Sequence, residues 1–247
     1  MGMKITGSIK AISALALMTA LAASVPLAGN ANPHGAVPQV SPPCSHAFGK
    51  TLKEWLTIYW RWSYSGADIA KSKVDGVQLM PLPAGEQTGG TGTPQDPAAY
   101  VGKLEITLHP GTPFVLPLYA WVRERYEGWP TVPDDPLMSE QVGLAIGHPC
   151  LKIDGRTIIT DANKAAFYVP TTPFHPIVAY ETPSSYGSVA AVSFQGVGFV
   201  SPPLPPGRHV IHLYEPLIIP AGAYPGVPDG LGVVYDNTWI VTVKPGK

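Results

Sequence analysis

The sequence has few cysteines, few charged residues and no basic block, and each shortage limits what the protein can be. Only two cysteines occur in 247 residues, Cys44 and Cys150. Neither belongs to a C-x-x-C pair, which argues against a reactive or metal-binding cysteine site. Charged residues make up only 13% of the chain. Because no cluster of lysine and arginine is available to neutralise phosphates, we expect no nucleic-acid partner.

An apolar run near the N-terminus is too short to span a bilayer. Two lysines precede this run over residues 11–23, and small residues follow at 29–31. That order is typical of a secretory signal peptide. We therefore expect residues 1–31 to be removed, the mature chain to start near Asn32, and the protein to be secreted or periplasmic without a membrane span. Removing the two lysines changes the formal net charge from −1 to −3.

The remaining chain, residues 32–247, is predicted to form a single mainly β domain. It has no internal repeat, and the 29 prolines and 26 glycines of the sequence favour short strands joined by turns. Residues 103–109 alternate between apolar and polar, and Asp154-Gly155 separates two strand-like arms as in a β-hairpin. Residues 66–100 are poor in large apolar groups and predict an irregular connection. We expect a β-sandwich or jelly roll with one or two short packed helices.

The aromatic stretch TLKEWLTIYWRWSYS predicts an amphipathic helix that ends before Gly66. Thr51 and Glu54 have the spacing of a capping box. Trp60 and Tyr64 flank the polar face, so the spacing leaves open whether they are exposed to solvent. Aromatic residues at helical spacing usually belong to a hydrophobic core, so we expect this stripe to pack against the sheet rather than to form a ligand platform. The apolar positions of the stripe are Leu52, Trp55, Leu56, Tyr59 and Trp62.

The compartment inferred from the N-terminus also bears on the cysteines. Exported proteins fold under oxidising conditions, so Cys44 and Cys150 are expected to pair. Such a bridge would close a loop of roughly a hundred residues, which stabilises the fold by about 4–5 kcal/mol in the chain-entropy model. It would join the mature N-terminus to the middle of the fold.

Five segments of the chain form a recognisable series. In chain order they are GKTLKEWLTIYWRWSYS, PGTPFVLPL, IDGRTI, PPGRHVIHL and DNTWIVTV. Together they resemble a family of uncharacterised exported bacterial proteins, whose members have a tryptophan-rich E-W…W-W-x-W helix and a closing P-G-x-H-x-I-H strand. The resemblance implies a shared exported β-rich domain and brings no established activity.

Motifs of known chemistry are missing from the sequence. It contains no G-x-S-x-G elbow, H-E-x-x-H pair, P-loop or EF-hand loop. His209 and His212 are three residues apart in an expected strand, so their side chains should point to opposite faces rather than share a metal ion. We expect neither a metal site nor a cofactor.

One cluster, YAWVRERYEGWP, is a candidate binding site. Charged groups beside aromatic rings can hydrogen-bond and stack on a polar ring such as a sugar, and loops at sandwich ends often bind ligands. The alternative is a self-paired salt-bridge cluster with packed aromatics. The candidate residues, expected in a loop at the end of a buried run, are Trp121, Arg123, Glu124, Arg125, Tyr126, Glu127 and Trp129.

These observations favour a non-enzymatic binding or structural protein of the cell envelope or secretome. Carbohydrate, or another envelope component, is the candidate partner. The alternative is a hydrolase acting on a polysaccharide, in which Glu124 and Glu127 would be the two carboxylates that glycoside cleavage requires. No catalytic residue can be assigned from the sequence.

Overall fold

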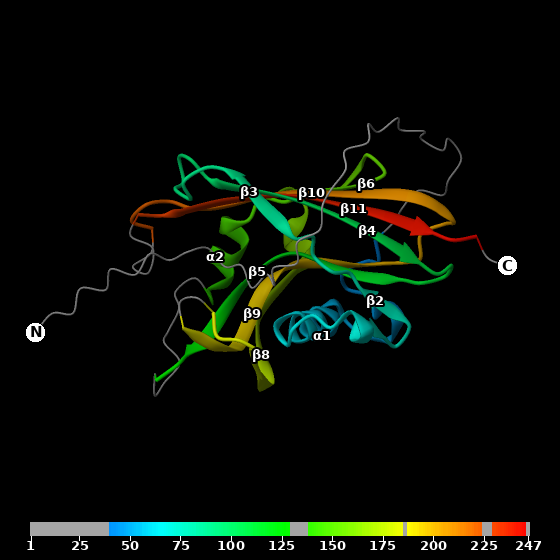
Figure 1. Cartoon of the computed structure of the whole chain (residues 1–247), viewed down its shortest axis with the longest axis horizontal. Helices are drawn as coiled ribbons and strands as arrows, with labels where there is room; N and C mark the ends of the chain where they lie inside the picture. Colours follow the sequence, from blue (N-terminus) through cyan, green and yellow to red (C-terminus); the bar gives the residue numbers. More distant parts are fainter. Residues whose placement is uncertain (1–39, 129–137, 185–186, 224–228, 246–247) are drawn as a thin grey trace, which may run out of the picture.

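Two β-sheets pack face to face in the computed structural model, which describes residues 40–128, 138–184, 187–223 and 229–245 (Figure 1). The predicted signal peptide, residues 1–31, lies outside the described residues. The five-stranded sheet has the order β1 (Lys73–Val74), β2 (Val77–Leu79), β5 (Phe114–Tyr126), β9 (Ser188–Ser201) and β8 (Tyr168–Ala179). The six-stranded sheet has the order β3 (Gly85–Gly89), β4 (Ala98–Leu108), β11 (Leu231–Val243), β10 (Gly207–Ile219), β6 (Cys150–Ile153) and β7 (Arg156–Ile159). The prediction of a mainly β sandwich is confirmed.

Helices are few and short. Helix α1 (Leu52–Tyr64) lies along the five-stranded sheet, and α2 (Glu140–Ile146) lies near one end of the sandwich (Figure 1). Three short 3₁₀ turns lie wholly within the described ranges: η1 (Ala47–Gly49), η2 (Ile69–Lys71) and η4 (Lys164–Phe167). None of the helices in the described ranges is long and apolar enough to cross a membrane.

Helix α1 begins at the predicted capping box. The Thr51 N–H donates to Glu54 Oε2 at 2.7 Å, and the Glu54 N–H donates to Thr51 Oγ1 at 3.2 Å. The predicted stripe Leu52, Trp55, Leu56, Tyr59 and Trp62 is buried against the outer face of the five-stranded sheet. Trp60 differs from the prediction: only 7% of it is exposed, because its ring stacks on Tyr64 and faces the interior beyond the edge of this sheet.

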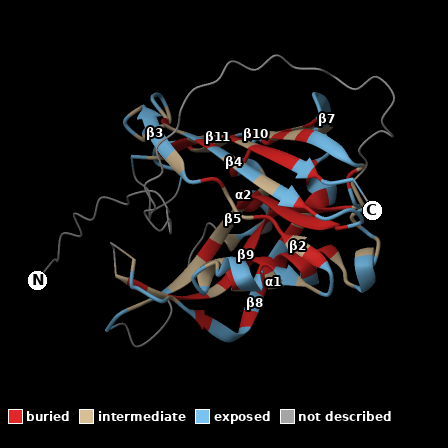
Figure 2. Ribbon diagram, turned by 45° about the vertical axis from the view of Figure 1, so that its right-hand side comes forward, coloured by how far each residue is buried: buried red, intermediate tan, exposed pale blue. Residues whose placement is uncertain are grey.

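Strand β5 is buried on both faces for much of its length. One face packs against α1 and the other against the six-stranded sheet, and buried residues concentrate in these two layers (Figure 2). Pro117 stands at a break in the β5–β9 register, so it marks a bulge, as its missing N–H favours. On the other side of β5, β2 pairs only with Phe114 and Val115. Beyond those residues, no described strand pairs with this edge of β5.

The segment 66–100, expected to be irregular, contains the three short strands β1, β2 and β3, and β4 begins at Ala98. These strands have two to five residues each, too few for a period-2 pattern to be detected. Val77 and Leu79 are nonetheless fully buried. The sheet context, rather than a strong local pattern, makes this segment extended.

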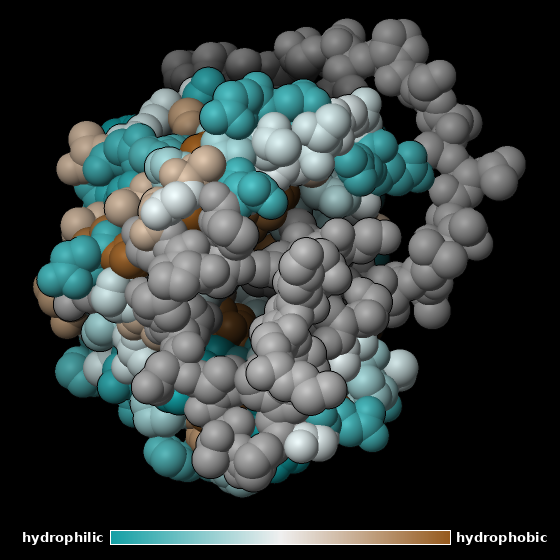
Figure 3. Space-filling model, turned by 90° about the vertical axis from the view of Figure 1, so that its left-hand side faces the viewer, coloured by the Kyte–Doolittle hydropathy of each residue, from teal (hydrophilic) through white to brown (hydrophobic). Residues whose placement is uncertain are grey.

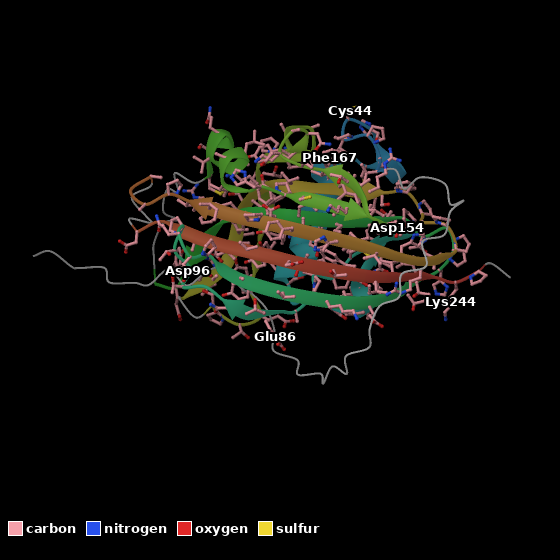
Figure 4. The ribbon with its side chains drawn as sticks, turned by 90° about the horizontal axis from the view of Figure 1, so that it is seen from above. Cys44, Glu86, Asp96, Asp154, Phe167 and Lys244 are labelled. Carbon is pink, nitrogen blue, oxygen red and sulfur yellow. The ribbon has the colours of Figure 1, made fainter. Side chains whose placement is uncertain are left out.

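The predicted bridge between Cys44 and Cys150 is not formed, and both thiols are free. Cys44 lies in a turn beside Ser41, whose N–H donates to Val200 O of the five-stranded sheet at 2.8 Å. Figure 4 shows Cys44 at one side of the sandwich, near Phe167. Cys150 instead opens β6 in the six-stranded sheet, opposite Tyr214. The two cysteines are therefore held by different sheets, and the fold does not place them as a disulfide pair.

The predicted hairpin is present, with Asp154 and Gly155 between β6 and β7 at φ values of 51° and 76°. Positive φ at both positions is what a two-residue hairpin turn requires. The Asp154 carboxylate also accepts the Val210 N–H at 2.8 Å and lies 2.7 Å from His209 Nδ1. His209 Nε2 lies 2.8 Å from the Pro205 carbonyl. Both ring nitrogens therefore face acceptors, an arrangement that suits the doubly protonated ring.

This geometry predicts a pH dependence of stability. The bond to Asp154 raises the pKa of His209 above its usual 6.5, although burial acts in the opposite direction. A raised histidine pKa stabilises the fold fully below about pH 6.5, and that contribution is lost as the pH rises through the folded-state pKa. We expect His209→Gln to reduce the fall in melting temperature between pH 6 and pH 8. His109→Gln, at an exposed position directly after β4, is the control; an unchanged profile for His209→Gln would contradict the prediction.

Candidate functional site

The predicted cluster at residues 121–129 is not a loop. Residues 121–126 are the last part of β5, paired with β9 from Trp121 opposite Gln195 to Tyr126 opposite Ser188. Glu127 and Gly128 follow in a turn, and Trp129 lies outside the described residues. The charged side chains do not interrupt the strand because it runs past the compact part of the sandwich, where Arg125 and Glu127 are exposed.

The strand distributes this cluster over two sides of the sheet. Trp121 packs with residues of the six-stranded sheet and α2. Glu124 accepts hydrogen bonds from Tyr180 Oη at 2.5 Å and Ser188 Oγ at 2.8 Å, and Tyr180 contacts Tyr64 of α1 with 5.8 Å between ring centroids. Trp121 therefore faces the interior between the sheets, while Glu124 lies toward the outer, helix-bearing side. The cluster residues that the structure describes therefore do not lie on one surface.

A cavity of about 170 Å³ lies at the uncovered edge of β5, between α1 and the inner face of the six-stranded sheet. Of the cluster residues that the structure describes, only Trp121 lines it. Figure 3, which faces the end of the sandwich where β5 and β10 finish, shows strongly hydrophobic atoms deep in the hollow between the two halves. Most of the wall is aliphatic, contributed by Leu82, Pro83, Leu118, Ala120, Ile146, Leu217, Ile219, Leu231 and Val233.

Aromatic rings form the rest of the wall. Tyr100 of β4 and Tyr235 of β11 stack with 5.7 Å between centroids and 28° between planes. Trp60 and Tyr64 of α1 stack at 5.4 Å and 19°. With Trp121, these rings supply flat apolar faces from α1, β4, β5 and β11. Such faces bind rings and alkyl groups well, because they combine a large contact area with few rotatable bonds.

Two polar groups of the wall are buried without a hydrogen-bond partner among the described residues. They are Trp60 Nε1 and Asn237 Oδ1, and the two residues are only 7% and 8% exposed. Each unsatisfied buried group destabilises a fold by about 1–3 kcal/mol. Buried polar groups that remain unpaired are uncommon in folded proteins, so their presence together in one cavity marks this region for function.

A second polar cluster lies near the cavity but does not line it. Glu215 of β10 is fully buried, and neither of its carboxylate oxygens has a hydrogen-bond partner among the described residues. Burial raises the pKa of Glu215 well above its usual range, and the positive charge of Lys164 only partly offsets this. Lys164 itself donates to the Gly147 carbonyl and pairs with Asp161 at 2.7 Å.

This second cluster fixes the C-terminal end of α2. A methyl group added at Gly147 would lie 2.8 Å from Glu215 Oε1 and 2.6 Å from the Tyr119 ring, so only glycine fits there. The Tyr119 hydroxyl donates to the Gly143 carbonyl at 3.0 Å, and burial raises its pKa. The groups hold α2 against the sheets, and its last residue, Ile146, forms part of the cavity wall.

Sequence reasoning missed the cavity, although one signal was available. Asn237 shares its face of β11 with Tyr235 and Trp239, which lie two residues away on either side. A polar residue on the core face of an otherwise apolar strand indicates either a buried partner or a ligand. The remaining wall residues are ordinary core types, and nothing in their spacing distinguishes them from packing residues.

The described residues contain no group of three or more histidine, cysteine, aspartate or glutamate side chains that could hold a metal ion. His209 and His212 lie on opposite faces of β10, as their spacing predicts, and bind Asp154 and Asp236 respectively. No model of a known protein family matches the chain, and no curated protein matches it either.

Proposed function

We propose that the protein is a non-enzymatic binding protein whose cavity takes a small, uncharged, largely apolar molecule. The observation that carries this proposal is the cavity itself, with stacked aromatic pairs on two sides and two buried polar groups that lack partners. Ligand sites commonly combine apolar and aromatic walls with a few converging polar groups.

The size of the cavity sets the scale of the ligand. An apolar cavity of about 150 Å³ can hold benzene, and this cavity measures about 170 Å³. It therefore fits a single ring with a small substituent, and a longer molecule would extend out of the opening. No charged side chain of the part of the chain that the structure describes lines the cavity, so an ion would lose its hydration without gaining a partner there.

The composition of the wall also supports binding rather than catalysis. Among the described residues, the lining contains no histidine, cysteine, aspartate, glutamate or lysine, the side chains that most often transfer protons or attack a substrate. Glu215 is close, but it is fully buried behind the wall. The signal-like N-terminus supports placing this binding function in the periplasm or outside the cell.

The test of this proposal is a titration of the mature protein with toluene. Binding is measured by isothermal calorimetry and by the NMR chemical shifts of the tryptophan side chains. We expect saturable binding of one toluene per chain. Val233→Phe, which puts a ring into the cavity from β11, should abolish saturation because the space is then filled. Val234→Phe is the matched control, because this neighbouring side chain points to the opposite face. No toluene binding by the wild type, or equal binding by both variants, would refute the proposal.

Carbohydrate is a second candidate ligand, and one observation favours it. Trp121 and the Tyr100–Tyr235 pair present aromatic faces of the kind that stack on sugar rings. The wall offers few hydrogen-bonding groups for sugar hydroxyls, which is why we place this candidate second. The hydrolase alternative, with Glu124 and Glu127, stays a prediction that nothing in the described residues favours.

A further inference from the structure

The cavity wall changes character along β11. Its inward-facing lining residues are Leu231, Val233, Tyr235 and Asn237, in that order. The apolar end is reinforced by β10, where Ile219 lies opposite Leu231 and Leu217 opposite Val233. Leu231 and Asn237 are six residues apart, about 20 Å along an extended strand, so a single ring held near Asn237 contacts only the nearer part of this wall.

The lining also contains polar side chains from both the helix and the sheet. Asn237 and Trp60 are more than nine-tenths buried, and each has one polar atom without a partner among the described residues. Ser63, one turn of α1 beyond Trp60, adds a hydroxyl group to the same wall. A hydrogen-bond donor and an acceptor without partners are thus both present among the lining residues.

We propose that the ligand is an uncharged amphiphile, a small apolar ring or chain that carries one hydroxyl group. This inference rests on the proposed function. The hydroxyl lies at Asn237 and Trp60, and the apolar body extends toward Leu231 and Ile219. A hydroxyl fits because it can donate to the Asn237 carbonyl oxygen and accept from the Trp60 N–H.

Access to these two groups requires side-chain movement. Asn237 Oδ1 and Trp60 Nε1 are both covered by neighbouring atoms, so the Asn237 amide must turn and the atoms over Trp60 Nε1 must shift before a ligand reaches them. Rotation about the last torsion of an asparagine is soft. The hydrogen bonds formed then satisfy groups that are otherwise buried and unpaired, which favours the bound state.

The test compares p-cresol with toluene, which differ by one hydroxyl group, on the mature protein by calorimetry. A wholly apolar cavity binds toluene more tightly, because the cresol hydroxyl loses its hydration. We expect the reverse in the wild type, with p-cresol about three- to tenfold tighter, the range of a net hydrogen bond. Asn237→Leu should restore the preference for toluene, while toluene itself binds as before.

Trp60→Phe is the second variant, because it keeps an aromatic ring in the α1 wall and removes the N–H donor together with part of the indole. It should weaken p-cresol more than toluene, even if Asn237→Leu fails to fold. A wild-type preference for toluene would overturn the amphiphile inference and leave the proposed function standing. A cresol preference that survives both substitutions would also overturn it. If neither compound binds, the proposed function fails, and this inference fails with it.

Discussion

Replacing Trp55 by alanine is expected to lower the free energy of unfolding by about 3–5 kcal/mol, the range for deleting a large buried aromatic side chain. Trp55 is fully buried between α1 and the outer face of the five-stranded sheet. Its Nε1–H donates to the Ala47 carbonyl at 2.7 Å. The substitution removes this bond and leaves a cavity beneath the helix, and urea denaturation of the folded protein measures the loss.

Lys53→Ala provides the control for this substitution. Lys53 is exposed on the polar face of the same helix, and alanine favours the helix, so its effect should stay within about 0.5 kcal/mol. Small and equal effects at both positions would mean that the aromatic stripe does not stabilise the sandwich. The two substitutions therefore separate a core helix from an exposed aromatic platform.

Replacing Glu215 by glutamine is expected to remove a large part of the pH dependence of stability in the acid range. Burial holds the pKa of Glu215 well above 4.5, so its contribution to stability is fully present below about pH 4.5 and is lost as the pH rises through the folded-state pKa. Between about pH 4.5 and the folded-state pKa of Glu215, the free energy of unfolding falls by up to about 1.4 kcal/mol per pH unit. Glutamine has nearly the same shape and does not ionise.

The measurement is urea denaturation at several pH values between 4.5 and 6.5, below the range in which His209 acts. The wild-type curve should fall relative to that of Glu215→Gln as the pH rises. Glu86→Gln is the matched control, because Glu86 is exposed on β3 (Figure 4), and its curve should follow the wild type. Parallel curves for wild type and Glu215→Gln would show that the buried carboxyl does not bind its proton more tightly in the folded state.

Much of the secondary structure was predictable because it depends on neighbours along the chain. The Thr51–Glu54 capping box, the helical stripe and the Asp154-Gly155 turn each act within a few residues, and all three are present as predicted. Trp60 was misjudged because helical spacing gives only the side of the helix on which a residue lies. Its burial depends on how far α1 extends past the edge of β5.

The expected cysteine pair and the treatment of residues 121–129 as one loop differ from the structure for a related reason. Pairing of Cys44 with Cys150 was inferred from their number and compartment, which do not specify distance. The fold places Cys44 in a turn beside the five-stranded sheet and Cys150 in the six-stranded sheet. The cluster at 121–129 was treated as one surface because its residues are adjacent in sequence. In the extended strand β5, adjacent side chains point to opposite sides, so Trp121 and Glu124 were separated.

By itself, the sequence determined the fold class, the aromatic helix and the hairpin, since hydrophobic periodicity and turn chemistry are local properties. Only the tertiary structure decided where a ligand could bind. The cavity joins Trp60 of α1, Tyr100 of β4, Trp121 of β5 and Asn237 of β11, which are far apart in the chain. Their proximity follows from the parallel pairing of β4 with β11 and from the short β2, which leaves the edge of β5 uncovered. Such long-range pairings are set by the packing of the whole sandwich, and no local pattern encodes them.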